Sequence, residues 1–243
     1  MLTIRNLSKS LQSGQEVLSK ISVQIDEGEL IGLVGGSGSG KTTLLKCIAL
    51  KEKWDEGQFI YEDRDITSLG MIEKFKVKRD WAYVEEKAPL DLKKSAVKNV
   101  LQGRFYEKSA LRVLTGTHAR DEHVLAMDYL EKVGLLDKAE MKAQDLSGGE
   151  RQRIAIARAL VQGAKIVIAD EPVSGLDPDS ANSVLSDLRD LCKREKVTVI
   201  ASLHHLEFAE KYASRIWGIK EGRIVLDIAG RRLTSLERNK IFD

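Results

Sequence analysis

The sequence of 243 residues predicts an α/β fold that carries a helical insertion. Two patterns indicate this fold: short β-rich apolar runs alternate with helical segments near both ends of the chain, and the stretch between them has mostly helical spacing. The apolar fraction of 42% is ample for a packed core, and the charged fraction of 31% is typical of a folded surface. This composition argues against intrinsic disorder.

Each predicted element is a run of apolar residues with strand or helix spacing, bounded by turn-forming residues. The expected strands cover residues 2–4, 21–25, 30–34, 58–61, 82–84, 166–169, 198–202, 216–219 and 223–226. The expected helices of the α/β part cover residues 42–50, 180–195 and 206–212.

The insertion is predicted from apolar residues that recur three and four positions apart between residues 95 and 133. These residues are Val97, Val100 and Leu101, then Val124, Leu125, Tyr129, Leu130 and Val133. Such spacing places side chains on one face of a helix. We expect a single domain in which 1–86 and 146–230 form the catalytic core and 87–145 a helical subdomain. The polar tail 231–243 is expected to hold a short surface helix.

Charge, cysteine content and hydropathy exclude several classes of protein. The net charge is +2, from 39 basic and 37 acidic residues, so no strong overall field draws the chain to nucleic acid, and no nucleic-acid partner is expected. Cys47 and Cys192 are far apart and outside any Cys-x-x-Cys pair, which favours reduced thiols over a metal site. The longest apolar runs are strand-sized, so we expect no membrane-spanning helix.

A glycine-rich segment follows the predicted strand 30–34 directly. It fits Gly-x-x-x-x-Gly-Lys-Ser/Thr, between a strand and a helix, as this phosphate-binding motif requires. Glycines bring backbone N–H groups against phosphate oxygens, and the helix start adds its positive dipole end. A flexible glycine-serine loop is the alternative, which the flanking elements disfavour. The expected nucleotide-binding residues are Gly35, Gly36, Ser37, Gly38, Ser39, Gly40, Lys41, Thr42 and Thr43.

Within this motif, Lys41 is expected to reach the β- and γ-phosphates, and the Thr42 hydroxyl to ligate magnesium. Two acids, Asp170 and Glu171, end the apolar run 166–169. In a protein with such a loop, an Asp at a strand end holds magnesium, and a neighbouring acid can deprotonate the attacking water. The alternative is that both acids only solvate the strand end. We predict ATP hydrolysis, with Asp170 on magnesium and Glu171 as general base.

A second glycine-rich helix start lies at residues 146–150, before a helix with periodic apolar residues. Ser147 and Glu150 have the spacing of a capping box, which by itself explains a helix start. A capping box does not need Gly148 and Gly149, however. We expect these glycines to let a phosphate approach the helix N-terminus, making a second anion site.

The Leu-Ser-Gly-Gly-Glu sequence at 146–150 resembles the signature of ABC ATPases, the nucleotide-binding subunits of ABC transporters. Residues 174–177, Ser-Gly-Leu-Asp, resemble the D-loop of that family, and His204 stands where its switch histidine is expected. The resemblance covers nearly the whole chain. It implies a P-loop NTPase with a RecA-like mixed-sheet core, an antiparallel β part and a helical subdomain.

The resemblance also implies how the parts work. Two subunits pack head to tail, so that Ser147, Gly148 and Gly149 contact the nucleotide of the opposite subunit. His204 senses the γ-phosphate as a catalytic residue, whereas without the family it is most simply a core or surface histidine. The implied cofactors are ATP and Mg²⁺, and the implied location is peripheral, on the cytoplasmic face of the inner (plasma) membrane.

One branch of the family is closest in pattern. Residues 100–104 followed by 109–114 resemble the helical insertion of the ATPase subunits of phosphonate importers, and 169–173, 202–204 and 222–225 agree. The implied partners are a membrane permease and, indirectly, an extracytoplasmic binding protein, with a phosphonate, phosphite or phosphate-like anion as cargo. A soluble ABC ATPase acting on nucleic acid or a protein assembly, and an exporter subunit, remain alternatives.

Two positions depart from the family pattern. Glu86 stands where the family has the Q-loop glutamine that ligates magnesium and meets the permease; a carboxylate can still ligate the metal. Its negative charge is expected to slow basal hydrolysis or change its coupling. Leu11 stands where an aromatic residue commonly stacks on adenine, with Val17 in the same pocket, so base selectivity is expected to be loose.

Overall fold

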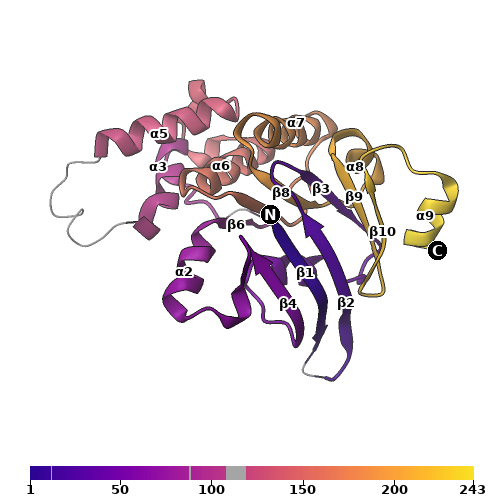
Figure 1. The fold of residues 1–243 in the computed structure, drawn as a ribbon. Coiled ribbons are helices and arrows are strands. Elements are labelled where there is room, and N and C mark those ends of the chain that lie inside the picture. Colours follow the sequence, from indigo (N-terminus) through magenta and orange to yellow (C-terminus); the bar gives the residue numbers. More distant parts are fainter. Residues whose placement is uncertain (12, 88, 108–118) are drawn as a thin grey trace.

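The computed structural model describes residues 1–11, 13–87, 89–107 and 119–243, and Figure 1 shows their fold. The strands are β1 (Leu2–Ser10), β2 (Glu16–Ile25), β3 (Leu30–Val34), β4 (Glu56–Tyr61), β5 (Arg64–Asp65), β6 (Trp81–Val84), β7 (Ile166–Ala169), β8 (Thr198–Ser202), β9 (Arg215–Lys220) and β10 (Arg223–Ala229). The α-helices are α1 (Lys41–Ile48), α2 (Met71–Arg79), α3 (Ala96–Leu101), α5 (Ala119–Lys132), α6 (Gly148–Val161), α7 (Pro178–Glu195), α8 (Leu206–Tyr212) and α9 (Ser235–Phe242).

The strands of the described residues form two sheets. The larger sheet is mixed, in the order β10-β9-β3-β8-β7-β6, with β9, β3, β8, β7 and β6 parallel and β10 antiparallel at one edge. The smaller sheet is antiparallel, in the order β2-β1-β4-β5. Figure 1 shows the smaller sheet below the larger one and most helices above it. The predicted mixed core with an antiparallel part is therefore present.

Strand β3 is buried on both faces, which explains its uninterrupted apolar sequence. Leu30 and Val34 belong to the core beneath the helices, whereas Ile31 and Leu33 belong to the core between the sheets. The second core also encloses α1 through Leu44, Leu45, Cys47 and Ile48.

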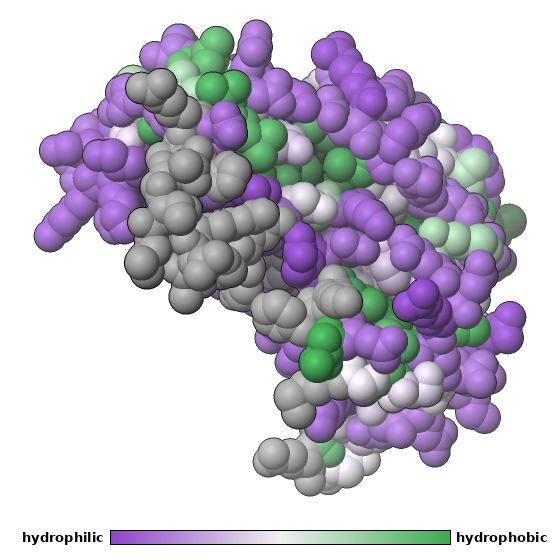
Figure 2. All heavy atoms as spheres, turned by 60° about the vertical axis from the view of Figure 1, so that its left-hand side comes forward, coloured by the Kyte–Doolittle hydropathy of each residue, from purple (hydrophilic) through white to green (hydrophobic). Residues whose placement is uncertain are grey.

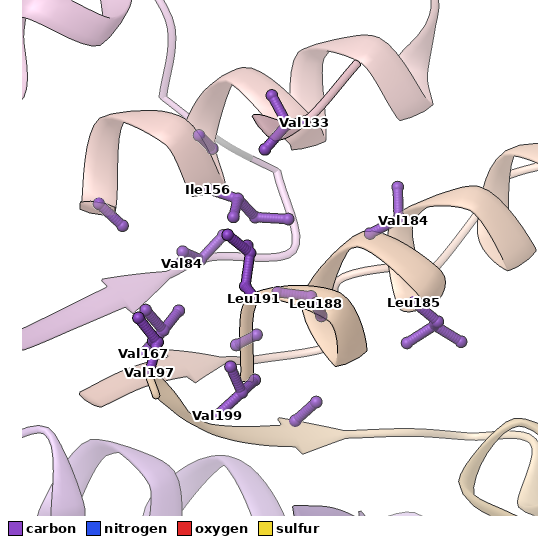
Figure 3. Close-up of a cluster of buried hydrophobic side chains, with 14 of the residues drawn as sticks. Val84, Val133, Ile156, Val167, Val184, Leu185, Leu188, Leu191, Val197 and Val199 are labelled. Carbon is purple, nitrogen blue, oxygen red and sulfur yellow. The ribbon is translucent and has the colours of Figure 1, made fainter. Parts of the chain in front are cut away.

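The core beneath the helices is built from strand residues that face helix residues. In Figure 3, side chains of β6, β7 and β8 lie beneath Ile156 of α6 and Leu188 and Leu191 of α7. Val84, Val167 and Val199 are buried in this cluster. The parallel strands are thereby fixed with their carboxyl ends at one edge, where the predicted site residues follow.

The helical part is formed by α3, α5 and α6, which pack on one another. Within α5 the predicted apolar face is mostly correct, since Leu130 is buried; Val124, however, is 68% exposed and does not belong to that face. Because α6 also packs against β6 and α7, the division of the chain at residue 146 stays a proposal. Residues 109–114, used above for the phosphonate-importer resemblance, lie outside the described residues.

Figure 2 brings α2, α3 and α5 forward and shows a mainly hydrophilic surface with smaller apolar areas. Over the described ranges, none of the helices combines the length and the apolar character needed to cross a membrane. The short helix expected in the tail is α9, which Thr234 caps by accepting from the Glu237 N–H.

Candidate functional site

The phosphate-binding loop lies between β3 and α1, as predicted, and its glycines are needed for two reasons. Gly38 and Gly40 have positive φ angles of 74° and 102°, in the left-handed region that favours glycine. At Gly35 a Cβ atom would lie 2.3 Å from the carbonyl oxygen of Ile219, and at Gly40 it would lie 3.0 Å from that of Val17. The loop is therefore held tightly against β9 and β2.

Lys41 is folded back into this loop. Its side chain is buried, and its Nζ donates to the carbonyl oxygens of Gly35 and Gly36, at 2.9 Å in both cases. Burial lowers the pKa of Lys41, while the negative charges of Glu171 and Asp170 oppose that shift. The ammonium group thus lies in the loop within the field of two carboxylates, where a bound anion would stabilise its charged form.

Asp170 is held through both of its carboxylate oxygens. The Ser202 hydroxyl donates to Oδ1 at 2.8 Å, and the Tyr83 hydroxyl donates to Oδ2 at 2.9 Å. The Thr42 hydroxyl lies 3.3 Å from Oδ1. The end of β7 and the start of α1, which are distant in sequence, therefore meet as predicted, and Oδ1 faces the threonine.

Glu171 has a left-handed backbone, with φ of 52°, a conformation that costs energy for a residue with a side chain and occurs often at functional sites. Its N–H donates to the Ser202 hydroxyl oxygen at 2.8 Å. Its Oε1 lies 2.6 Å from Nε2 of His204, whose side chain is 50% exposed. The structure thus brings the predicted general base and the predicted switch histidine into contact.

The residues at the edge of the sheet suit a magnesium ion. Thr42 and Asp170 supply a hydroxyl and a carboxylate oxygen 3.3 Å apart, and magnesium prefers such hard oxygen donors, with the remaining positions taken by phosphates and water. Glu86 is exposed and follows β6 at the same edge, where the Asp170 N–H donates to the Val84 carbonyl oxygen. Glu86 therefore follows the strand that pairs with β7, at the end where Asp170 lies.

The signature-like turn at 147–149 begins α6. Ser147 and Glu150 form the predicted capping box: the Glu150 N–H donates to Ser147 Oγ at 3.2 Å, and the Ser147 N–H to Glu150 Oε2 at 2.8 Å. A Cβ on Gly149 would lie 2.9 Å from Cβ of Ser180 in α7, and one on Gly148 would lie 3.0 Å from Leu176. Packing within the chain therefore gives a reason for these glycines that does not depend on the expected approach of a phosphate.

The two residues predicted to contact the base lie near the end of the β1–β2 hairpin where the two strands are connected. Leu11 directly follows β1 and is 50% exposed, and Val17 lies on β2 with its carbonyl oxygen against Gly40. Val17 is thus adjacent to the phosphate-binding loop.

Sequence reasoning did not assign Ser202 or Tyr83 to the site. The register of the parallel strands could have found them, because Ala169 lies opposite both Val84 and Ala201. Residues next to these positions share the sheet edge with Asp170. In the sequence, the hydroxyl groups of Ser202 and Tyr83 near the ends of apolar strands could have indicated that these residues belong to the site.

With this geometry in place, comparison with known proteins defines the class. Residues 18–174, which include the loop, the turn before α6 and both acids after β7, match the family described as ABC transporter. The chain belongs to the ABC transporter family.

Similar proteins of known name cover almost the whole chain. It is 36% identical over 242 residues to the phosphonates import ATP-binding protein PhnC of Lactococcus lactis subsp. cremoris (strain SK11), spanning 100% of this chain and 98% of that protein. It is 39% identical over 227 residues to the protein of the same name from Bacillus cereus (strain ATCC 14579), spanning 93% and 88%.

Among solved structures, the dimeric ATP-binding cassette MJ0796 in a post-hydrolysis state, bound to ADP and Pi, matches with a TM-score of 0.78. That match has 28% identity and covers 96% of this chain and 100% of the other. The family and the fold class predicted from the sequence are confirmed.

Proposed function

We propose that this chain is the ATP-hydrolysing subunit of a membrane importer for phosphonate, phosphite or a phosphate-like anion. The proposal rests on two contacts at one edge of the sheet. Thr42 lies against Asp170, and His204 lies against Glu171. The relatives named as phosphonates import proteins support the cargo class.

The geometry supports specific roles in hydrolysis. The backbone N–H groups of the loop and the start of α1 bind the β- and γ-phosphates, and Lys41 exchanges its bonds to the Gly35 and Gly36 carbonyls for phosphate oxygens. Thr42 and Asp170 would hold magnesium, with Glu86 as a further candidate ligand, and a bound ion would supply positive charge to the phosphates. Glu171 accepts the proton of the attacking water. His204 orients that carboxylate and senses the γ-phosphate.

The residues at the start of α6 belong, in this proposal, to the nucleotide of a second subunit packed head to tail. Gly148 lies close to Leu176 in the D-loop-like segment 174–177, and Gly149 lies close to Ser180 at the start of α7. The turn 147–149 and the segment 174–177 are therefore adjacent. The dimeric state of the solved cassette MJ0796 supports the pairing.

A cavity of about 730 Å³ supports the permease as partner. Its walls come from residues 49–51 after α1, the end of α2, β6, residues 102–103 at the start of a 3-10 helix, and α6. Glu85, the neighbour of Glu86, also lines it. Among the described residues that line the cavity, four are basic, namely Lys51, Lys78, Arg79 and Arg158, and one is acidic, Glu85. This charge suits a cytoplasmic permease segment with acidic side chains, which would hold the chain on the cytoplasmic face of the membrane. An extracytoplasmic binding protein would act through the permease.

The decisive experiment is reconstitution of the chain in liposomes with its permease and binding protein. We expect uptake of a labelled phosphonate that needs Mg²⁺ and ATP and is lost with Lys41→Ala. Hydrolysis of ATP without uptake of phosphonate, phosphite or phosphate would overturn the cargo assignment. A wild-type chain that binds no nucleotide would overturn the whole proposal.

A further inference from the structure

The Asp170 carboxylate accepts a hydrogen bond from Tyr83, a residue that the predicted site did not include. The bond is made to the carboxylate oxygen that does not face Thr42. Oδ1 faces Thr42 and accepts from Ser202, whereas Oδ2 accepts from Tyr83 at 2.9 Å. A carboxylate bonded through only one oxygen can still rotate about its last single bond. The second bond removes that freedom, so Oδ1 is presented to the metal position in one orientation.

The ring that carries this hydroxyl is itself held in place. The Lys51 Nζ lies over the Tyr83 ring, 4.2 Å from its centroid, and the same ammonium group lies 3.0 Å from Glu85 Oε1. Such cation–ring contacts are attractive. Tyr83 also packs against the core between the two sheets. The hydroxyl is therefore aimed at Asp170 by contacts made before any ligand binds.

Tyr83 donates this hydrogen bond from the edge of a cavity. The side chains of Tyr83, Lys51 and Glu85 all line the cavity of about 730 Å³ described above.

We propose that Tyr83 is a positioning residue that fixes the Asp170 carboxylate for magnesium, reaching it from the wall of the cavity. The inference rests on the proposed binding of magnesium-ATP at Asp170. It assigns Tyr83 no contact with the substrate: the residue acts through Asp170. Loss of the Tyr83 hydroxyl lets the Asp170 carboxylate rotate and thereby weakens metal binding. Binding of the phosphates by the loop does not depend on the metal and stays unchanged.

The test uses Tyr83→Phe, which keeps the ring, its Lys51 contact and the cavity wall. Binding of Mn²⁺ to the chain–ATP complex is followed by electron paramagnetic resonance, and binding of a fluorescent ATP analogue is measured in EDTA. We expect Mn²⁺ affinity to fall roughly three- to tenfold, the range for one lost hydrogen bond, with no change in EDTA. The Mg²⁺ concentration for half-maximal hydrolysis should rise by the same factor.

Tyr61→Phe is the matched control. The Tyr61 hydroxyl also donates to an aspartate, Asp80 Oδ2, at 2.9 Å, and Asp80 lies at the opposite end of β6 from Glu85. Both variants lose one partly buried tyrosine–aspartate hydrogen bond, so similar melting temperatures would show that they are equally well folded. Only Tyr83→Phe should change metal affinity.

Two results would overturn the inference: unchanged Mn²⁺ affinity in Tyr83→Phe, or equal weakening of nucleotide binding with and without metal. The second would mean a structural role only. If the wild-type chain itself retains no ATP in EDTA or in Mn²⁺, the proposed function has failed, and the inference about Tyr83 fails with it.

Discussion

His204 Nε2 lies 2.6 Å from Glu171 Oε1, and the two residues come from the ends of adjacent parallel strands, β8 and β7. The contact places an imidazole on the carboxylate proposed to activate water. It leaves the second carboxylate oxygen, Oε2, to meet that water.

Replacing Glu171 by Gln keeps the shape of the side chain and removes its capacity to accept a proton. We expect ATP to be bound and the dimer to be stabilised, while turnover falls about a hundredfold or more, as for loss of a general base. Size-exclusion chromatography with ATP and a phosphate-release assay measure both effects. Glu207→Gln, at an exposed position of α8, is the control. Normal turnover by Glu171→Gln would remove the assignment.

Glu86→Gln restores the neutral oxygen donor that the family pattern has at this position. Removing a negative charge near the γ-phosphate and the attacking water should raise the basal rate of hydrolysis or change its stimulation by the permease. Steady-state rates with and without permease test this, beside Glu140→Gln, which removes an exposed charge elsewhere. The hypothesis is wrong if both rates equal those of the wild-type chain.

Leu11 gives apolar contact without aromatic stacking, so the wild-type chain should bind ATP and GTP with similar affinity. Leu11→Tyr should tighten binding of ATP about fivefold, within the range for stacking of a base on an aromatic ring. Competition against a fluorescent nucleotide measures both. Leu92→Tyr is a matched control, because Leu11 and Leu92 are both 50% exposed. Strong preference of the wild-type chain for ATP would contradict the prediction.

Asp187 makes stability depend on pH. Its side chain is 23% exposed, and its Oδ2 lies 3.9 Å from Nη1 of Arg153. Burial raises the pKa of Asp187 to about 6 from an ordinary 3.8, with Arg153 opposing the shift and Asp190 adding to it. Because the folded chain then holds this proton more tightly than the unfolded chain, the carboxyl lowers stability as pH rises from 3.8 toward about 6.

Asp187→Asn removes this penalty. We expect the free energy of unfolding at pH 7.5 to rise by on the order of 1–2 kcal/mol, after allowance for partial exposure. Most of the gain should vanish near pH 4, where the wild-type carboxyl is already neutral in the folded chain. Urea unfolding at both pH values measures this, with the exposed Asp137→Asn as control. An equal gain at both values would contradict the explanation.

The sequence sufficed for the elements that carry strong local patterns. Strand β3 was predicted with its bounds because it is apolar throughout. Strand β1 was predicted only as 2–4, yet it extends to Ser10: Asn6 has φ of 50° and the pairing register with β2 shifts between Ile4 and Leu7. This irregularity breaks the period of two on which strand prediction depends.

Helix α2 was not predicted, because its sequence, MIEKFKVKR, has no continuous apolar stripe, and Ile72 is 76% exposed. The positions of Lys41 in the loop and of Asp170 and Glu171 at the end of β7 were predictable because a motif names these residues; their roles stay predictions. Tyr83 and Ser202 were not predictable, because their contacts with Asp170 depend on how β6, β7 and β8 are aligned side by side.

The enclosure of α1 limits which parts of this chain can move. Leu44, Leu45 and Ile48 are fully buried between the two sheets, and a close-packed interior does not let one helix slide alone. If the proposed nucleotide shifted against the start of α1, we would expect both sheets to move with that helix. Relative motion within the chain is then expected where α3 and α5 pack on the rest of the chain, mainly through α6.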